Sequence, residues 1–297
     1  MSSVQRVVKY IAMFFAICLT ICIIATIVKV GVGVIGAFVP SNEREQVTSN
    51  NKSENKNEYE YEEQTGDSLD FHDVKNLDIE SSIYKVQVKS DNSLDCVRIQ
   101  KYDIPSSYRI KYDEGSKTIE TEDDNWVSGF FKKRHSASKG KIVVYVPENQ
   151  ELDEVVIEMG VGAVSIEDIK TDTLDVECGI GSFSCENVAA KYAAIEGGVG
   201  SVDCENVTFK GMELSGGVGD INIQGDISGK SDISAGMGNL SLEIDGNKKD
   251  YNYKVETGLG PIYIDGEKTD DVDVYNNSHD NLIDVEGGIG AIHVDFK

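Results

Sequence analysis

The chain has 297 residues, 40% of them hydrophobic, which is enough apolar material for one or two folded domains. Its formal net charge is −24, and residues 1–40 contain three basic residues and no acidic ones, so residues 41–297 carry 25 basic against 52 acidic residues, or −27. A domain this acidic repels nucleic acids and anionic lipid headgroups and attracts cations or basic partners, so we expect no nucleic-acid partner.

The first predicted element is a membrane helix over residues 10–28. This segment contains no charge and no proline, and a helix of this length spans about 28 Å, close to the hydrocarbon thickness of a bilayer. Arg6 and Lys9 precede the span, so residues 1–9 are expected to be a cytoplasmic tail. Residues 10–39 then form the transmembrane helix and its juxtamembrane extension. A cleaved signal peptide is the alternative, although its apolar region is normally shorter.

Residues 40–66 are predicted to be a disordered acidic linker. They are rich in Asn and Glu and show no apolar periodicity, so they cannot bury enough surface to fold. A flexible spacer of this length would hold the rest of the chain roughly a few nanometres from the bilayer. We therefore expect a single-pass protein of the cell membrane whose C-terminal domain is extracytoplasmic.

Residues 67–150 are predicted to be an irregular β region that caps the regular region after it, because alternating runs such as 141–149 indicate strands. Within it, residues 124–140 concentrate the only tryptophan of the chain beside aromatic and basic residues. Such a segment can dock at a bilayer surface or an anionic polymer, and the alternative is that its aromatic rings pack onto the end of the domain. The candidate interaction residues are Trp126, Phe130, Phe131, Lys132, Lys133 and Arg134.

The strongest pattern in the chain lies in residues 151–297, where seven Gly-apolar-Gly triplets occur. The first five follow one another every 19 residues, and the last two intervals are 22 and 30 residues. Glycine permits a positive φ and close stacking of backbones, as a sharp corner requires. The repeat glycines are Gly160, Gly162, Gly179, Gly181, Gly198, Gly200, Gly217, Gly219, Gly236, Gly238, Gly258, Gly260, Gly288 and Gly290.

Apolar residues alternate with polar ones on both sides of each triplet, which predicts strands with one buried face. Equivalent residues one repeat apart can stack in parallel register about 4.8 Å apart, each coil covering the next. Val164, Phe183, Val202 and Ile221 should then lie in one interior column. The predicted fold is all-β, a parallel β-helix or β-solenoid with repeats of about 19 residues. An antiparallel sandwich is the alternative, but it predicts no fixed recurrence of this kind.

Two further columns follow from the repeat. The residue two positions before each triplet should point outward, and it is mostly glutamate: Glu158, Glu177, Glu196, Ser215, Ser234, Glu256 and Glu286. This column is either a strip for divalent cations or cationic peptides or a solvated face, because in-register carboxylates repel one another. Cys185 and Cys204 share an inward column, and buried free thiols are favoured over a disulfide because their side chains run parallel.

Three segments resemble a known family: LDIESSIYKVQVKSD (77–91), KIVVYVPENQELDEVVIEMGVGAVSIED (141–168) and LDVECGIGSFSCEN (174–187). They are similar to the bacterial putative-adhesin domain family, and the similarity covers residues 70–297. The resemblance implies an uncharacterised β-helical, membrane-anchored domain at the cell surface, associated with the envelope or with envelope stress. It implies no catalytic residues.

The motifs of common enzymes are missing from the sequence. His72, His135, His279 and His293 are scattered, and there is no GxSxG, HExxH or P-loop motif. No zinc-ligand spacing occurs among the cysteines, so no metal or cofactor is predicted. We expect a non-enzymatic, adhesin-like protein that contacts a cell-envelope or membrane-protein partner. The alternatives are an accessory protein in envelope-stress signalling and, by analogy of fold, a carbohydrate-active β-helix enzyme.

Overall fold

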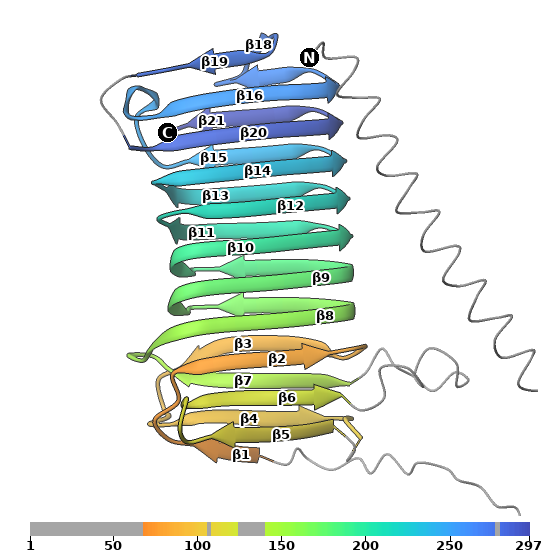
Figure 1. Cartoon of the computed structure of the whole chain (residues 1–297), viewed down its shortest axis with the longest axis vertical. Helices are drawn as coiled ribbons and strands as arrows, with labels where there is room; N and C mark the ends of the chain where they lie inside the picture. The colour runs from red at the N-terminus through yellow and green to blue at the C-terminus, as the bar shows by residue number, and fades with distance from the viewer. Residues whose placement is uncertain (1–67, 106–107, 124–139, 277–279) are drawn as a thin grey trace, which may run out of the picture. The chain divides into compact units, whose positions relative to one another are not determined.

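The computed structural model describes residues 68–105, 108–123, 140–276 and 280–297. This part of the chain is all-β: 21 strands form one sheet that winds into stacked coils, with a single 3₁₀ turn at Lys248–Asp250 (Figure 1). None of its helical segments is long and apolar enough to cross a bilayer. The predicted membrane helix over residues 10–28 and the linker over residues 40–66 lie outside the described residues.

The strands group into coils of the stack. Seven come before residue 150: β1 (Ser68–Phe71), β2 (Asn76–Ser81), β3 (Lys85–Asp91), β4 (Val97–Tyr102), β5 (Tyr108–Asp113), β6 (Thr118–Asp123) and β7 (Lys141–Pro147). Two long strands each turn a glycine corner: β8 (Glu151–Glu167) and β9 (Lys170–Glu186). Two-strand coils follow: β10 (Ala189–Val199) with β11 (Val202–Phe209), β12 (Met212–Val218) with β13 (Ile221–Ile227), β14 (Lys230–Met237) with β15 (Leu240–Ile244), β16 (Asn252–Leu259) with β17 (Ile262–Ile264), and β20 (Leu282–Ile289) with β21 (Ile292–Phe296). A short arm is made of β18 (Glu267–Thr269) and β19 (Val272–Val274).

The core consists of interior columns in which like positions of successive coils lie against one another. Val164 pairs with Phe183, Phe183 with Val202, and Val202 with Ile221, always in parallel register and 19 residues apart. All four side chains are buried. Burying each such side chain contributes about 1.5–3 kcal/mol, so the interior columns are the main stabilising feature of the stack. The predicted all-β fold and its interior column are confirmed, and the antiparallel sandwich is wrong for these coils.

The glycine triplets form one corner of every coil from β8 onward. The second glycine of each triplet has a φ between 141° and 157°, which side chains strongly disfavour. The coils also approach closely here: a Cβ on Gly181 would lie 1.6 Å from the carbonyl oxygen of Gly162, and one on Gly200 would lie 1.5 Å from that of Gly181. Only glycine therefore fits at the second glycine of every triplet after the first.

The opposite corner of the first regular coils is a turn in the left-handed region. Asp168, Asn187 and Asn206 have φ values of 58°, 56° and 54°. Their side chains join successive coils, because Asn187 Nδ2 donates to Asp168 Oδ1 at 2.9 Å and Asn206 Nδ2 donates to Asn187 Oδ1 at 2.5 Å. Asn and Asp tolerate this backbone conformation better than other side chains, which explains their recurrence every 19 residues.

The coils do not stack in chain order at either end of the stack (Figure 1). The C-terminal coil, β20 and β21, lies between the β14–β15 coil and the β16–β17 coil. At the other end, β2 and β3 lie between the β6–β7 coil and β8. The expectation that each coil covers the next one in sequence is therefore wrong at the ends. The alternating pattern is the same in every coil, so it cannot identify which coil is the neighbour.

Antiparallel strands close both ends of the stack. At the N-terminal end β1 pairs with β4, β4 with β7, and β5 with β6. At the other end β18 pairs with β17 and β19 with β16. These strands cover the backbone groups that an open end of a parallel stack would leave unpaired.

Candidate interaction surfaces

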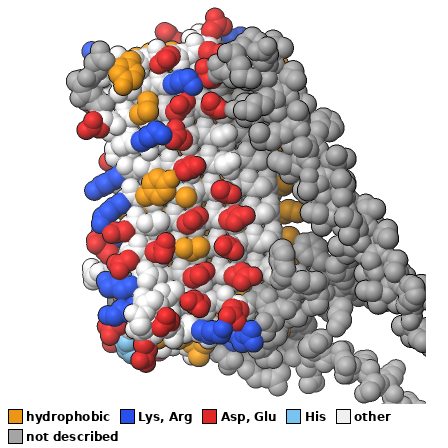
Figure 2. Space-filling model, in the orientation of Figure 1, with side chains coloured by type: hydrophobic (Ala, Val, Ile, Leu, Met, Phe, Trp, Pro, Cys, Tyr) orange, Lys and Arg blue, Asp and Glu red, His pale blue; other side chains and the backbone are white. Residues whose placement is uncertain are grey.

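The outward face of strands β2, β8, β9, β10, β12, β14, β20 and β16 carries two acidic columns (Figure 2). We call it the acidic face. The first column runs in register through Glu80, Glu158, Glu177, Glu196, Ser215, Ser234, Glu286 and Glu256. The second contains Asp78, Asp175, Glu213, Asp232 and Asp284, and ends at Lys254. The seven residues predicted to form an outward glutamate column therefore do share one face.

Burial and like charge act on the carboxyl groups of the second column. Partial burial, followed by the neighbouring Glu154, raises the pKa of Asp78. Burial also raises the pKa of Asp284, helped by Asp232 and Glu286 and opposed by Lys254. Lys254 Nζ lies 3.1 Å from a carboxylate oxygen of Glu256 and 3.6 Å from one of Asp284.

Other lysines offset part of this charge at the border of the face. Lys230 pairs with Asp232 at 2.7 Å, and Lys191 pairs with Asp172 at 2.5 Å. In the described part of the chain, no group of three or more His, Cys, Asp or Glu side chains is placed to hold a metal ion. The carboxylates of the acidic face are spread along the length of the stack.

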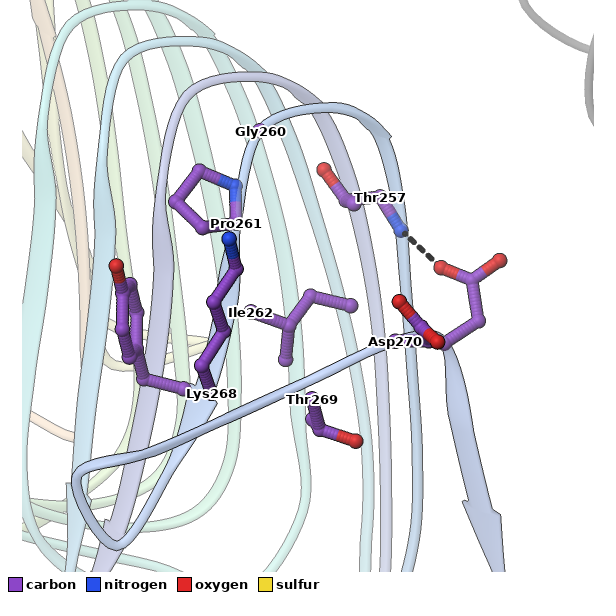
Figure 3. A pocket seen from close by; sticks show the side chains of 9 residues that line it. Thr257, Gly260, Pro261, Ile262, Lys268, Thr269 and Asp270 are labelled. Carbon is purple, nitrogen blue, oxygen red and sulfur yellow. Dashed lines mark hydrogen bonds between the residues drawn. The ribbon is translucent and has the colours of Figure 1, made fainter.

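A pocket of about 460 Å³ lies at the end of the stack, between the β16–β17 coil and the β18–β19 arm (Figure 3). Lys268 and Pro261 stand on one side, and Thr257 and Asp270 on the other. The backbone N–H of Thr257 donates to Asp271 Oδ1 at 3.2 Å, which ties the arm to the coil. The pocket brings together the ammonium group of Lys268, the hydroxyls of Thr257 and Thr269, and the carboxylates of Asp270 and Asp271. Its lining is Thr257, Gly260, Pro261, Ile262, Tyr263, Lys268, Thr269, Asp270 and Asp271.

The four cysteines in the described part of the chain are buried and unpaired: Cys96, Cys178, Cys185 and Cys204. Cys185 and Cys204 occupy equivalent positions of adjacent strands. The hydrogen bond with Cys185, together with burial, raises the pKa of the Cys204 thiol well above its ordinary value. Burial raises the pKa of Cys178 to about 11. The thiols of Cys178 and Cys204 are therefore protonated at neutral pH, and the four buried cysteines pack as small apolar groups.

The structure describes only part of the predicted site. All fourteen repeat glycines lie at the corner described above, whereas the candidate interaction loop from Trp126 to Arg134 lies outside the described residues. Sequence reasoning did not find the pocket, because residues 268–271 give only the signal of a polar loop. It also did not predict that the middle residue is exposed in five of the seven triplets: Ile180, Val199, Met237, Leu259 and Ile289. The sequence did carry a signal: the inward positions Ile157 and Val164 are an odd number of residues apart, so the alternation shifts by one residue across the triplet, as it does at a corner.

A protein-family model matches most of the described residues. The model of the family described as Toastrack DUF4097 matches residues 74–287, more than two thirds of the chain. The chain belongs to the Toastrack DUF4097 family. The resemblance to bacterial adhesin-like domains is thereby confirmed. A search of curated proteins finds no match to this Toastrack chain.

Several crystal structures are similar to this Toastrack chain. One, of a putative adhesin from Bacteroides fragilis NCTC 9343, is 17% identical, covers 76% of this chain and 95% of its own, and gives a TM-score of 0.45. A putative cell adhesion protein from Clostridium sporogenes ATCC 15579 is 16% identical, covers 78% of this chain and 100% of its own, and gives a TM-score of 0.34. A putative adhesin from Parabacteroides distasonis ATCC 8503 is 12% identical, covers 78% of this chain and 96% of its own, and gives a TM-score of 0.36.

Proposed function

We propose that this protein is a non-enzymatic, adhesin-like module of the cell envelope, anchored by a helix within residues 10–39 and binding other envelope components through its acidic face. The observation that carries the proposal is the pair of in-register acidic columns on one face of the stack. Carboxylates about 4.8 Å apart repel one another, and a cationic partner relieves that repulsion along the whole face.

The anchor and the linker support the same function. An apolar segment of 19 residues suits a single membrane span, and a polar linker after it would let the stack reach components beyond the bilayer. The net charge of residues 41–297 disfavours lying on an anionic membrane surface. The acidic face then remains available to partners.

The test is co-sedimentation of the full chain, held in phosphatidylcholine nanodiscs, with isolated cell envelopes. We expect binding that weakens as salt rises. It should weaken at least about threefold in the triple variant Glu158→Gln, Glu177→Gln, Glu196→Gln, because each exposed charge pair contributes about 0.2–1 kcal/mol. Envelope binding that is absent, or that ignores both salt and these substitutions, would contradict the proposal.

A matched control uses the opposite face of the stack. Glu167, Glu186 and Glu205 pair in register with one another on successive coils. Each directly follows a buried residue: Ile166, Cys185 and Cys204. The triple variant Glu167→Gln, Glu186→Gln, Glu205→Gln makes the same change in net charge and should leave binding nearly unchanged. An equal loss in both variants would mean that net charge, and not the acidic face, determines the interaction.

A further inference from the structure

The apolar residue in the middle of each glycine triplet lies outside the buried core: Val161 and Val218 are half-buried, and the other five are exposed. Ile180, Val199 and Leu259 expose 54%, 51% and 57% of their surface, and Met237 and Ile289 expose 39% and 47%. These are most of the large apolar side chains that the described residues leave exposed. We call the set the apolar ridge; in spatial order it consists of Val161, Ile180, Val199, Val218, Met237, Ile289 and Leu259.

The apolar ridge is continuous along the stack. Each member pairs in register with the next, including Met237 with Ile289 and Ile289 with Leu259 at the inserted coil. Six steps of about 4.8 Å give it a length of about 29 Å. Aliphatic side chains aligned over this length on the surface of a highly charged chain are a mark of a binding surface.

The backbone beside the apolar ridge is already hydrogen-bonded within the stack. Gly200 N–H donates to the carbonyl of Val218 at 2.8 Å, and Gly290 N–H donates to that of Leu259 at 3.0 Å. A partner strand therefore finds no free edge here and must bind through side-chain contacts. The glycines on both sides of the ridge carry no side chains, so a partner can approach the backbone closely, as small residues allow between packed helices.

Charge selects among the possible occupants. Glu158, Glu177 and Glu196 precede the ridge residues of their coils by three positions and are exposed. These carboxylates disfavour an anionic lipid surface, and a second copy would add the same acidic charge. An α-helix of about 19 residues has the length of the ridge, and Lys or Arg beside its apolar stripe would meet the carboxylates.

We propose that the apolar ridge binds an amphipathic helix of a partner protein whose apolar stripe is bordered by Lys or Arg. The proposal rests on the proposed function, since it names a partner class for an envelope-binding module. It adds a second surface, at the glycine corner, to the acidic face.

The probe is a synthetic 19-residue helix with a leucine stripe bordered by lysines, titrated into the full chain in phosphatidylcholine nanodiscs and followed by fluorescence anisotropy. The triple variant Ile180→Ser, Val199→Ser, Met237→Ser should weaken binding at least about tenfold, because the helix buries these side chains. The triple variant Glu158→Gln, Glu177→Gln, Glu196→Gln should weaken it about threefold. Tyr275→Ser is the matched control, since Tyr275 is 72% exposed and lies outside the ridge, and it should bind like the unchanged protein.

Four results would overturn the proposal. The serine triple variant could bind the probe as tightly as the unchanged protein while keeping the same thermal unfolding curve, or a probe with glutamates in place of lysines could bind equally well. Empty nanodiscs could account for all of the binding, or analytical ultracentrifugation could show a dimer that the serine variant dissociates. A dimer of this kind would assign the ridge to a second copy of the chain. Envelope co-sedimentation separates this failure from failure of the proposed function, because the serine triple variant would still co-sediment if only the ridge assignment were wrong.

Discussion

Replacing Gly200 with alanine is expected to lower the free energy of unfolding by about 3 kcal/mol or more, because two costs add at this position. The φ of Gly200 is 147°, which an alanine adopts only with strain. Its Cβ would also lie 1.5 Å from the carbonyl oxygen of Gly181 in the adjacent coil. That atom belongs to backbone fixed by the stack, so the two coils must separate. Urea unfolding of the full chain, followed by far-ultraviolet circular dichroism, measures the loss.

Gly162→Ala is the matched control for the overlap between coils. Gly162 occupies the same place in its triplet and has a φ of 157°, but a Cβ there meets first the flexible Met159 side chain, and backbone only at 3.3 Å. We expect it to cost about 1 kcal/mol, mainly from the backbone conformation. If both substitutions lower the free energy of unfolding equally, close stacking between coils is not what requires glycine at position 200.

Deleting residues 281–297 is expected to remove the folded state of residues 252–264, although these precede the deletion in the chain. β20 and β21 lie between the β14–β15 coil and the β16–β17 coil, so the deletion removes the parallel neighbour of both. In a stack of coils each coil is stabilised mainly by its neighbours, and an isolated one cannot bury its apolar face. Hydrogen exchange with mass spectrometry should show residues 252–264 exchanging like an unfolded peptide.

Residues 151–227 provide the internal control for this deletion. Their coils keep their neighbours, so their amides should stay protected to nearly the same extent as in the full chain. In a stack that followed chain order, deletion of the last coil would leave residues 252–264 protected. That outcome would contradict the inserted position of β20 and β21.

The repeat determined how much of this fold could be predicted from sequence. A 19-residue recurrence of alternating residues identifies the interior columns, because Val164, Phe183, Val202 and Ile221 can only be buried together if the coils stack in register. The order of the coils could not be predicted in the same way. Ile233 and Val285 lie in the same alternating pattern as the other members of their column, and nothing in that pattern indicates that these two lie side by side.

The two surfaces differ in how far sequence could predict them. The acidic column could be predicted because outward parity is fixed by the alternation of residues such as Ile157 and Glu158. The apolar ridge was harder to predict: the shift in alternation at each triplet indicates a corner, but it does not show how far the middle residue of that corner is exposed. The bend at Gly162 and its equivalents turns Val161 and Ile180 outward, and that geometry depends on packing between coils. The pocket near Lys268 depends on where the β18–β19 arm folds back, which local patterns do not specify.

The distance between positions 158 and 234 tests the in-register stack most directly. Spin labels on the variant Glu158→Cys, Ser234→Cys, in a chain whose six native cysteines are replaced by alanine, occupy exposed positions of one column, separated by four coil steps. Double electron–electron resonance on the full chain should give a single distribution centred near 19 Å, four steps of about 4.8 Å. A distribution centred beyond about 30 Å, or several separate distances, would contradict the stacked coils on which both proposed surfaces depend.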